Sequence, residues 1–247
     1  MDIEQFSKGK SFLHCFDPRL KIIIAVIFSI IIAVANQYNV IILGLAFSLL
    51  LILLSQLNIK AVIKRLFIIN GFILVIWLFL PFTMPGREVV FSIGPLKATM
   101  EGISYALKIT LKSNTILIAT IALLSTSSIF ILVHAMSHLY IPLKLIHLFF
   151  FCFRYIHVIH LEYTKLRNSI KIRCFTPGTN FHTYKTYAYL IGMILLKSYD
   201  RSKNIYNAML CRGFKGKYYL FDHFSLNKKD IISSILIFSF LILLIIL

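Results

Sequence analysis

The sequence predicts an all-α membrane protein with about five transmembrane helices and long cytoplasmic helices between the fourth and the fifth. Three observations carry this prediction. The 247 residues are 59% hydrophobic and their mean hydropathy is +0.85, well above the range of ordinary soluble domains. Five apolar runs are long enough to cross the hydrocarbon layer as helices. The largest polar segment is strongly basic, which is typical of a cytoplasmic segment.

The predicted spans are separated by polar or helix-breaking residues. The first two are joined by the sequence NQYN, from Asn36 to Asn39, whose turn-forming residues leave room only for a tight helical hairpin. Prolines in the sequence LPFTMP end the third run near Pro81. The five runs are residues Leu20–Asn36, Val40–Leu57, Leu66–Phe82, Asn114–Val133 and Ile231–Leu247.

The cations near the span ends predict a cytoplasmic N-terminus and a C-terminus outside. Cytoplasmic connections of membrane proteins carry an excess of Lys and Arg. By alternation, the connection Thr83–Ser113 then lies outside, although it also contains cations. The residues that place the N-terminus and the connection between spans two and three inside are Lys8, Lys10, Arg19, Lys21, Lys60, Lys64 and Arg65.

The segment between spans four and five, His134–Lys229, holds 15 of the 26 Lys and Arg residues and is predicted to be cytoplasmic. Leu143–Leu161 is long enough to cross the membrane, but Arg154 near its centre would cost about 2.5 to 3.5 kcal/mol. Tyr187–Leu196 is too short to cross. We interpret both stretches as helices that pack on the cytoplasmic side of the membrane-spanning part and on each other. The predicted organisation is residues 1–133 with spans one to four, residues 134–229 as a cytoplasmic helical module, and residues 230–247 as the last span.

The predicted spans contain no ionisable residue away from their edges, which argues against proton coupling or acid–base catalysis by this chain. The only Gly-Lys-Ser, Gly9–Ser11, lacks the earlier glycine of a phosphate-binding loop, so we expect no cofactor here and no enzyme. The cysteines have neither a disulfide framework nor zinc spacing. Two histidine pairs are interpreted as interfacial side chains rather than metal ligands, His134 with His138 and His157 with His160.

Three rival classes can be tested against the same residues. A membrane enzyme acting on lipid phosphates would need clustered carboxylates for a metal, and the cytoplasmic segment has only three scattered acids. A nucleic-acid-binding module is disfavoured, because cytoplasmic placement already explains the cations, and we expect no nucleic acid partner. A secondary carrier or channel that acts alone is kept as the alternative.

Two stretches of the cytoplasmic segment end alike. The sequences EYTKLRNSIKIRCF and DRSKNIYNAMLCRGF both predict helices that end on an arginine, a small residue and a phenylalanine, followed by helix breakers. Gly213 suits the left-handed position after a helix, and an arginine in the last turn meets the negative end of the helix dipole. A guanidinium can donate two hydrogen bonds to a carboxylate or bind a carbonyl, so Arg173 and Arg212 predict two docking points for a twofold partner.

Nearly the whole chain resembles the CbiQ/NikQ transmembrane proteins of energy-coupling factor (ECF) transporters for cobalt or nickel. The likeness is strongest from Phe153 to Tyr219 and includes the sequence DPRLK before the first span. In that family two short Ala-Arg-Gly-like signatures end cytoplasmic coupling helices, and each arginine docks on one of two ABC-type ATPase subunits. Both arginines are kept here, whereas the alanines and the first glycine are replaced. By position the signatures are Ile172, Arg173 and Cys174, and Cys211, Arg212 and Gly213.

The resemblance implies a non-catalytic scaffold in the cytoplasmic membrane of a bacterium. It would hold a membrane-embedded substrate-binding subunit of the CbiM/NikM type against its spans and two ATPases against its cytoplasmic helices. ATP, bound by those partners, would drive the motion that releases a divalent ion inward. The choice between cobalt and nickel rests on the resemblance alone.

Overall fold

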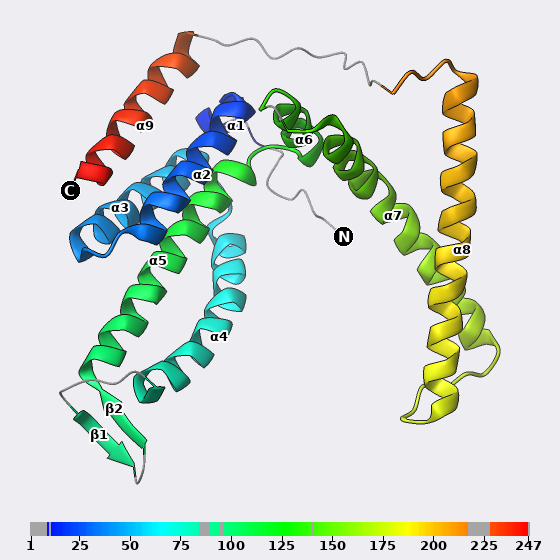
Figure 1. The fold of residues 1–247 in the computed structure, drawn as a ribbon, viewed down its shortest axis with the longest axis horizontal. Helices are drawn as coiled ribbons and strands as arrows, with labels where there is room; N and C mark the ends of the chain where they lie inside the picture. The colour runs from blue at the N-terminus through cyan, green and yellow to red at the C-terminus, as the bar shows by residue number, and fades with distance from the viewer. Residues whose placement is uncertain are drawn as a thin grey trace. The chain divides into compact units, whose positions relative to one another are not determined.

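The computed structural model describes residues 9, 11–83, 89–93, 96–139, 141–216 and 228–246, and the chain divides into two compact units. The first unit contains α1 to α6, a two-stranded hairpin and α9; the second contains α7 and α8 (Figure 1). The predicted helical membrane fold is confirmed, and the hairpin is an addition to it. The elements are α1 Phe12–Cys15, α2 Pro18–Val34, α3 Tyr38–Ser55, α4 Ile59–Thr83, β1 Val89–Ile93, β2 Leu96–Thr99, α5 Met100–Leu124, α6 Ile129–Ser137, α7 Leu143–Ile172, α8 Phe181–Cys211 and α9 Lys228–Ile246.

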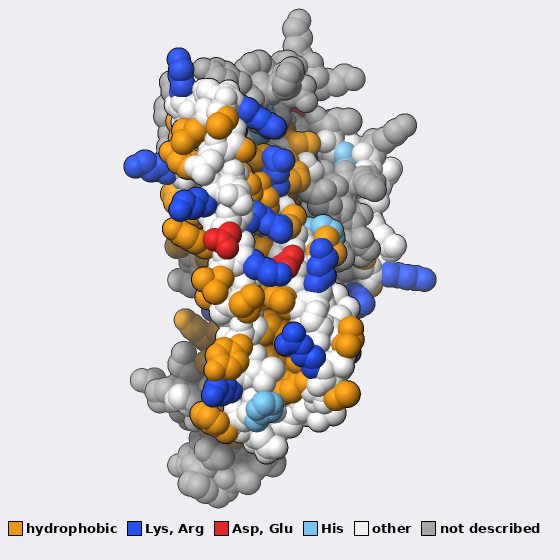
Figure 2. Space-filling model, turned by 90° about the vertical axis from the view of Figure 1, so that its right-hand side faces the viewer, with side chains coloured by type: hydrophobic (Ala, Val, Ile, Leu, Met, Phe, Trp, Pro, Cys, Tyr) orange, Lys and Arg blue, Asp and Glu red, His pale blue; other side chains and the backbone are white. Residues whose placement is uncertain are grey.

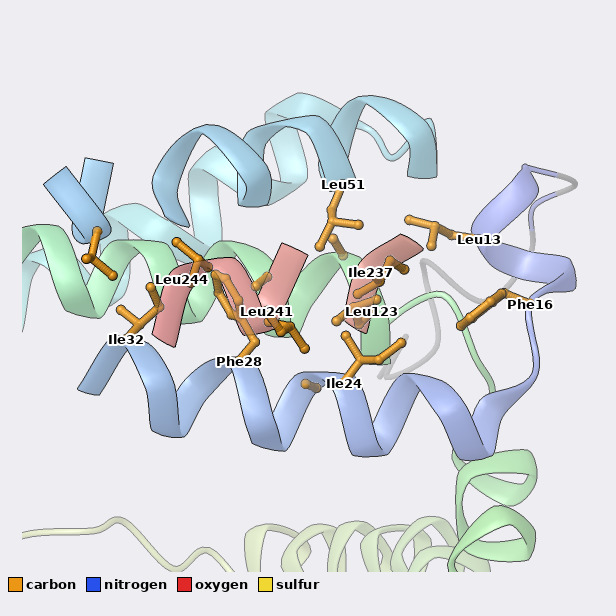
Figure 3. Packing of buried hydrophobic residues seen from close by; sticks show 14 residues of the cluster. Leu13, Phe16, Ile24, Phe28, Ile32, Leu51, Leu123, Ile237, Leu241 and Leu244 are labelled. Carbon is orange, nitrogen blue, oxygen red and sulfur yellow. The ribbon is translucent and has the colours of Figure 1, made fainter. Parts of the chain in front are cut away.

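The core of the first unit forms where α2, α3, α5 and α9 meet (Figure 3). Ile24, Phe28 and Ile32 recur every four residues along α2 and are fully buried, so one face of this helix meets the core. Leu123 of α5 and Leu241 of α9 belong to the same cluster. The last helix of the chain therefore packs with the first long one.

α2 begins at Pro18, just before the predicted apolar run from Leu20. Proline suits the first helical position, which Pro18 occupies. Asp17 caps the helix, because the backbone N–H of Arg19 donates to Asp17 Oδ1 at 2.9 Å. Only Ala35, Asn36 and Gln37 separate the end of α2 from the start of α3. The predicted tight hairpin is confirmed.

α5 begins at Met100, so the helix starts well before the apolar run predicted from Asn114. Thr99 caps this helix by accepting a hydrogen bond from the backbone N–H of Gly102 at 3.2 Å. Glu101 stands in the first turn, where a negative charge is favourable. This capping sequence is the signal that could have located the helix start. Half of the connection expected outside the membrane is therefore helical.

Two lysines lie on α5 as a result. Lys112 Nζ donates to the carbonyl of Ala33, near the end of α2, at 2.9 Å. Lys108 Nζ lies 4.6 Å from the centre of the Tyr38 ring at the start of α3. Both hold the α2–α3 connection against α5. Both lysines thus lie on the helix that contains the predicted fourth span, ahead of its apolar run.

α4 and α5 are joined by a polar seam. The side chains of Asn70 and Asn114 each donate an amide N–H to the other's Oδ1, at 3.1 and 3.0 Å. Further along, Trp77 Nε1 donates to Thr110 Oγ1 at 2.8 Å. Amide pairs of this kind contribute about 0.6 to 2 kcal/mol to helix association in membranes. They fix the register of α4 on α5.

The predicted fourth span is also interrupted. α5 ends at Leu124, and the chain resumes as the short helix α6. Ser128 caps α6, because the backbone N–H of Ile131 donates to its hydroxyl at 3.4 Å. Serine and threonine hydroxyls compete with helical backbone bonds, so a run of four of them is a break signal. The continuous span Asn114–Val133 is a wrong prediction.

The hydroxyls at this break accept hydrogen bonds from cations on other helices. Lys21 of α2 is fully buried, and its Nζ donates to Thr126 Oγ1 at 3.2 Å and to Ser127 Oγ at 2.6 Å. Arg65 of α4 donates through Nη1 to Ser125 Oγ at 3.3 Å. The break is thus attached to both α2 and α4.

Among the described residues, four helices are long and apolar enough to cross a membrane: α3, α4, α5 and α7. α9 carries a shorter apolar stretch, and α2 has 17 residues. Large apolar side chains on α4 are exposed, among them Phe67 and Phe72, as expected for a face turned to lipid. The number of five spans, their orientation and the division at residues 133 and 229 stay predictions.

The second unit is an antiparallel pair of long helices, α7 and α8 (Figure 1). A Glu162 carboxylate oxygen on α7 accepts a hydrogen bond from Lys197 on α8, and the other oxygen lies 3.9 Å from Arg201 Nη2. The two apolar stretches of this segment lie within these helices, and the predicted contact between the helices is confirmed. Their packing on the membrane stays a prediction. Both helices extend beyond the predicted stretches.

Candidate functional site

The first predicted signature closes the C-terminus of α7. Arg173 is the capping residue, with φ −79° and ψ 20°. Cys174 follows in the left-handed region with φ 59°. The backbone N–H of Cys174 donates to the carbonyl of Lys171 at 3.0 Å, and that of Phe175 donates to the carbonyl of Ile170 at 3.4 Å. These two bonds define a Schellman motif.

The second signature closes α8 in the same way. Arg212 is the capping residue, with φ −88° and ψ 9°, and Gly213 follows with φ 76°. The backbone N–H of Gly213 donates to the carbonyl of Leu210 at 2.9 Å, and that of Phe214 donates to the carbonyl of Met209 at 3.0 Å. The two endings predicted from sequence are therefore matched bond by bond, with an arginine, a left-handed residue and a phenylalanine at equivalent positions.

Both arginines lie at the surface beside carbonyls of their helix end. Arg173 and Arg212 are exposed, and a cation there is stabilised by the negative end of the helix dipole. Cys174 and Cys211 are exposed as well. Ile172 is 83% exposed. Each ending therefore has a guanidinium, a thiol and apolar surface exposed.

The structure does not bring the two signatures together. The Phe175 ring lies 6.1 Å from those of His182 and Tyr187, which places the first signature at the N-terminal end of α8. The second signature is at the C-terminal end of the same helix. At 1.5 Å per residue, the 31 residues of α8 separate them by roughly 45 Å. Two docking points this far apart can engage two separate protein surfaces.

Basic side chains are distributed along the face of the second unit rather than gathered into one cluster (Figure 2). Lys and Arg alternate there with hydrophobic side chains, and acids are few (Figure 2). Such a surface favours an acidic or anionic partner. Among the described residues no group of three or more His, Cys, Asp and Glu could hold a metal ion.

A groove between α7 and α8 was not predicted. Its volume is about 430 Å³, it is almost wholly apolar, and the Glu162–Lys197 pair lies on its wall. No motif marks it in the sequence, because it depends on the register of two helices. Its other wall residues are Phe151, Cys152, Tyr155, Val158, Ile159, Ser198, Arg201, Ser202, Ile205, Tyr206 and Met209.

Fold and site together define a multi-pass helical membrane protein that presents two matched, arginine-capped helix ends. The chain belongs to the CbiQ family, described as cobalt transport protein, whose family model matches residues 9–220. The predicted family membership is confirmed.

Curated relatives agree with this assignment. The energy-coupling factor transporter transmembrane protein EcfT of Streptococcus equi is 28% identical over 94% of this chain and 91% of its own length. The proteins of the same name from Leuconostoc gelidum and Listeria innocua are 26% and 27% identical over 86% and 87% of this chain, and 83% and 85% of their own lengths. The chain is thus a transmembrane component of the ECF type and a multi-pass protein of the bacterial cytoplasmic membrane.

Proposed function

We propose that this chain is the non-catalytic, energy-coupling subunit of an ECF-type ABC importer for a divalent metal, cobalt or nickel. It links two ABC-type ATPase subunits, which bind the ATP, to a membrane-embedded substrate-binding subunit of the CbiM/NikM type. The description of the matched family as cobalt transport protein supports the choice of substrate.

The observation that carries the proposal is the pair of identical Schellman endings with an exposed arginine at each cap. Ile172, Arg173 and Cys174 form one contact site for an ATPase, and Cys211, Arg212 and Gly213 form the other. In each, the guanidinium makes charge-assisted hydrogen bonds in a groove of the ATPase. Closure of the ATPase pair moves the two helix ends, and the chain passes this motion to the substrate-binding subunit.

Replacing Arg173 or Arg212 by Ala tests this proposal. Loss of a buried, charge-assisted contact costs about 2 to 5 kcal/mol of binding free energy. We expect the amount of ATPase that co-purifies from membranes to fall at least tenfold with each single variant. The double variant should show no ATP-dependent uptake of cobalt or nickel. Arg167→Ala is the matched control, because Arg167 is an exposed arginine of α7 outside the signature.

Normal ATPase recovery with the double variant would contradict the proposal. The alternative, a carrier or channel that acts alone, makes a different prediction for the purified chain reconstituted in vesicles. It requires cobalt or nickel flux without ATPase subunits and without ATP. We expect no such flux.

A further inference from the structure

The groove between α7 and α8 has an apolar end and a charged end. Phe151 and Met209 lie at the first, and Glu162 and Lys197 lie at the second. The α7 residues of the apolar part belong to a helix that is long and apolar enough to cross a membrane. The groove therefore divides into an apolar and a polar part in the same way as a membrane lipid does.

The dimensions of the groove fit a single hydrocarbon chain. Its wall on α7 extends from Phe151 to Glu162, which is about 16 Å of helix. A volume of about 430 Å³ over this length gives a mean cross-section of about 27 Å². Carbon atoms in contact are about 4 Å apart, so this section takes one extended chain. An α-helix with its side chains is about 10 to 12 Å across and does not fit inside the groove.

The charged end has two cations against one carboxylate on the groove wall. Lys197 and Arg201 stand one turn apart on α8, and both lie beside Glu162. The Glu162 side chain is 17% exposed, whereas those of Lys197 and Arg201 are 44% and 43% exposed. Arg201 Nη2 lies 3.9 Å from Glu162 Oε2, which is longer than a hydrogen bond. Because an ammonium has three donors and a guanidinium five, both cations can bind a second anion such as a phosphate.

We propose that the groove binds an anionic phospholipid of the membrane. One acyl chain lies between α7 and α8, and the phosphate accepts hydrogen bonds from Lys197 and Arg201. The positive charge of this end favours an anionic lipid over a zwitterionic one, whose headgroup would bring a further cation close to these two. The bound chain fills the space between the helices with apolar contacts. The site does not depend on the proposed function and requires only that the chain lies in a membrane.

Photoactivatable lipids test the site in the full-length complex purified from membranes. Phosphatidylglycerol and phosphatidylcholine with the same diazirine-bearing acyl chain are compared, and the labelled peptides are identified by mass spectrometry. We expect phosphatidylglycerol to label wall residues such as Tyr155 and Tyr206 at least fivefold more than phosphatidylcholine does. Labelling confined to other parts of the chain, or equal labelling of the wall by both lipids, would overturn the inference.

Variants test the charged end and the apolar part separately. Lys197→Gln with Arg201→Gln should remove the preference for phosphatidylglycerol. Lys203→Gln is the matched control, because Lys203 is exposed on α8 outside the groove, and it should leave the preference unchanged. Ser202→Phe places a ring in the apolar part and keeps both cations, so labelling by both lipids should fall at least fivefold. An unchanged preference in the double variant, or unchanged labelling with Ser202→Phe, would contradict the proposal.

The thiol of Cys152 gives a second measurement that leaves the groove unaltered, because it is exposed on the groove wall. Cys15, Cys174 and Cys211 are replaced by Ser, and the reaction of Cys152 with a small apolar maleimide is timed in detergent. We expect added phosphatidylglycerol to slow the reaction at least fivefold relative to phosphatidylcholine. Inorganic phosphate should not slow it, because it fills no apolar space.

Three outcomes of the thiol measurement would overturn the inference. The first is an equal rate with both lipids, and the second is slowing by inorganic phosphate alone. The third is protection of Cys152 that persists in the complex after its lipid has been removed, because this would place a protein partner over the groove instead of a lipid.

Discussion

At the scale of single residues, the two signatures differ most in backbone strain. Gly213 adopts its left-handed conformation without steric cost, whereas Cys174 holds nearly the same conformation with a side chain. The sequence predicted the left-handed position at Gly213 from residue type. It did not predict it at Cys174, because propensity disfavours a non-glycine residue there and only the hydrogen-bonded helix end imposes it.

Cys174→Gly should therefore strengthen the end of α7 by about 1 kcal/mol. The Phe175 amide, which donates to the Ile170 carbonyl, reports on this end. We expect its hydrogen exchange to slow by about fivefold.

Gly213→Ala is the matched opposite change at the end of α8. A side chain at this position meets no atom within 4 Å, so the variant probes backbone conformation alone. Exchange of the Phe214 amide should accelerate by about fivefold. Unchanged exchange in both variants would show that the left-handed residue does not limit the stability of either end.

At the scale of elements, periodicity and length located the long apolar helices, but hydrogen-bonding residues decided where they begin and end. The caps at Asp17 and Thr99 use signals that were present in the sequence. The contact between Lys21 and the hydroxyls of Thr126 and Ser127 was not predictable, since it joins residues more than 100 positions apart. It requires the packing of α2 against the α5–α6 break.

Lys21→Met should destabilise the first unit. The change removes a fully buried ammonium and leaves hydroxyls at the α5–α6 break without their donor. Hydrogen bonds to charged groups contribute about 1.5 to 3 kcal/mol, so we expect a loss of this size in the free energy of unfolding, measured in detergent micelles.

Lys60→Met is the control for this change, because Lys60 is exposed on α4. Its effect should stay within about 0.5 kcal/mol. Equal stability of the two variants would mean that Lys21 does not hold the break.

At the scale of the whole molecule, the orientation of the chain in the membrane is predicted only from the Lys and Arg residues near the span ends. The exposed thiol of Cys211 provides the test. In a variant with Cys15, Cys152 and Cys174 replaced by Ser, a membrane-impermeant maleimide should label Cys211 in inside-out vesicles and leave it unlabelled in intact cells. Labelling of intact cells would reverse the predicted topology.

The family and the two matched helix ends could be predicted from the sequence, because both depend on short local motifs. The groove between α7 and α8 could not, because it arises from how two helices meet. The same holds for the seam of Asn70 and Asn114, whose partners are 44 residues apart. Features set by neighbouring residues in the sequence could be predicted, whereas contacts between distant helices could not.

The uninterrupted length of α8 has a mechanical consequence. A rod of roughly 45 Å converts a small angular change into a large translation. If one tip is held and the rod swings by about 10°, the opposite tip travels about 8 Å, more than the pitch of an α-helix. If two ATPases hold the helix ends as proposed, a slight change in the angle between them would therefore displace the far end of α8 by several ångströms.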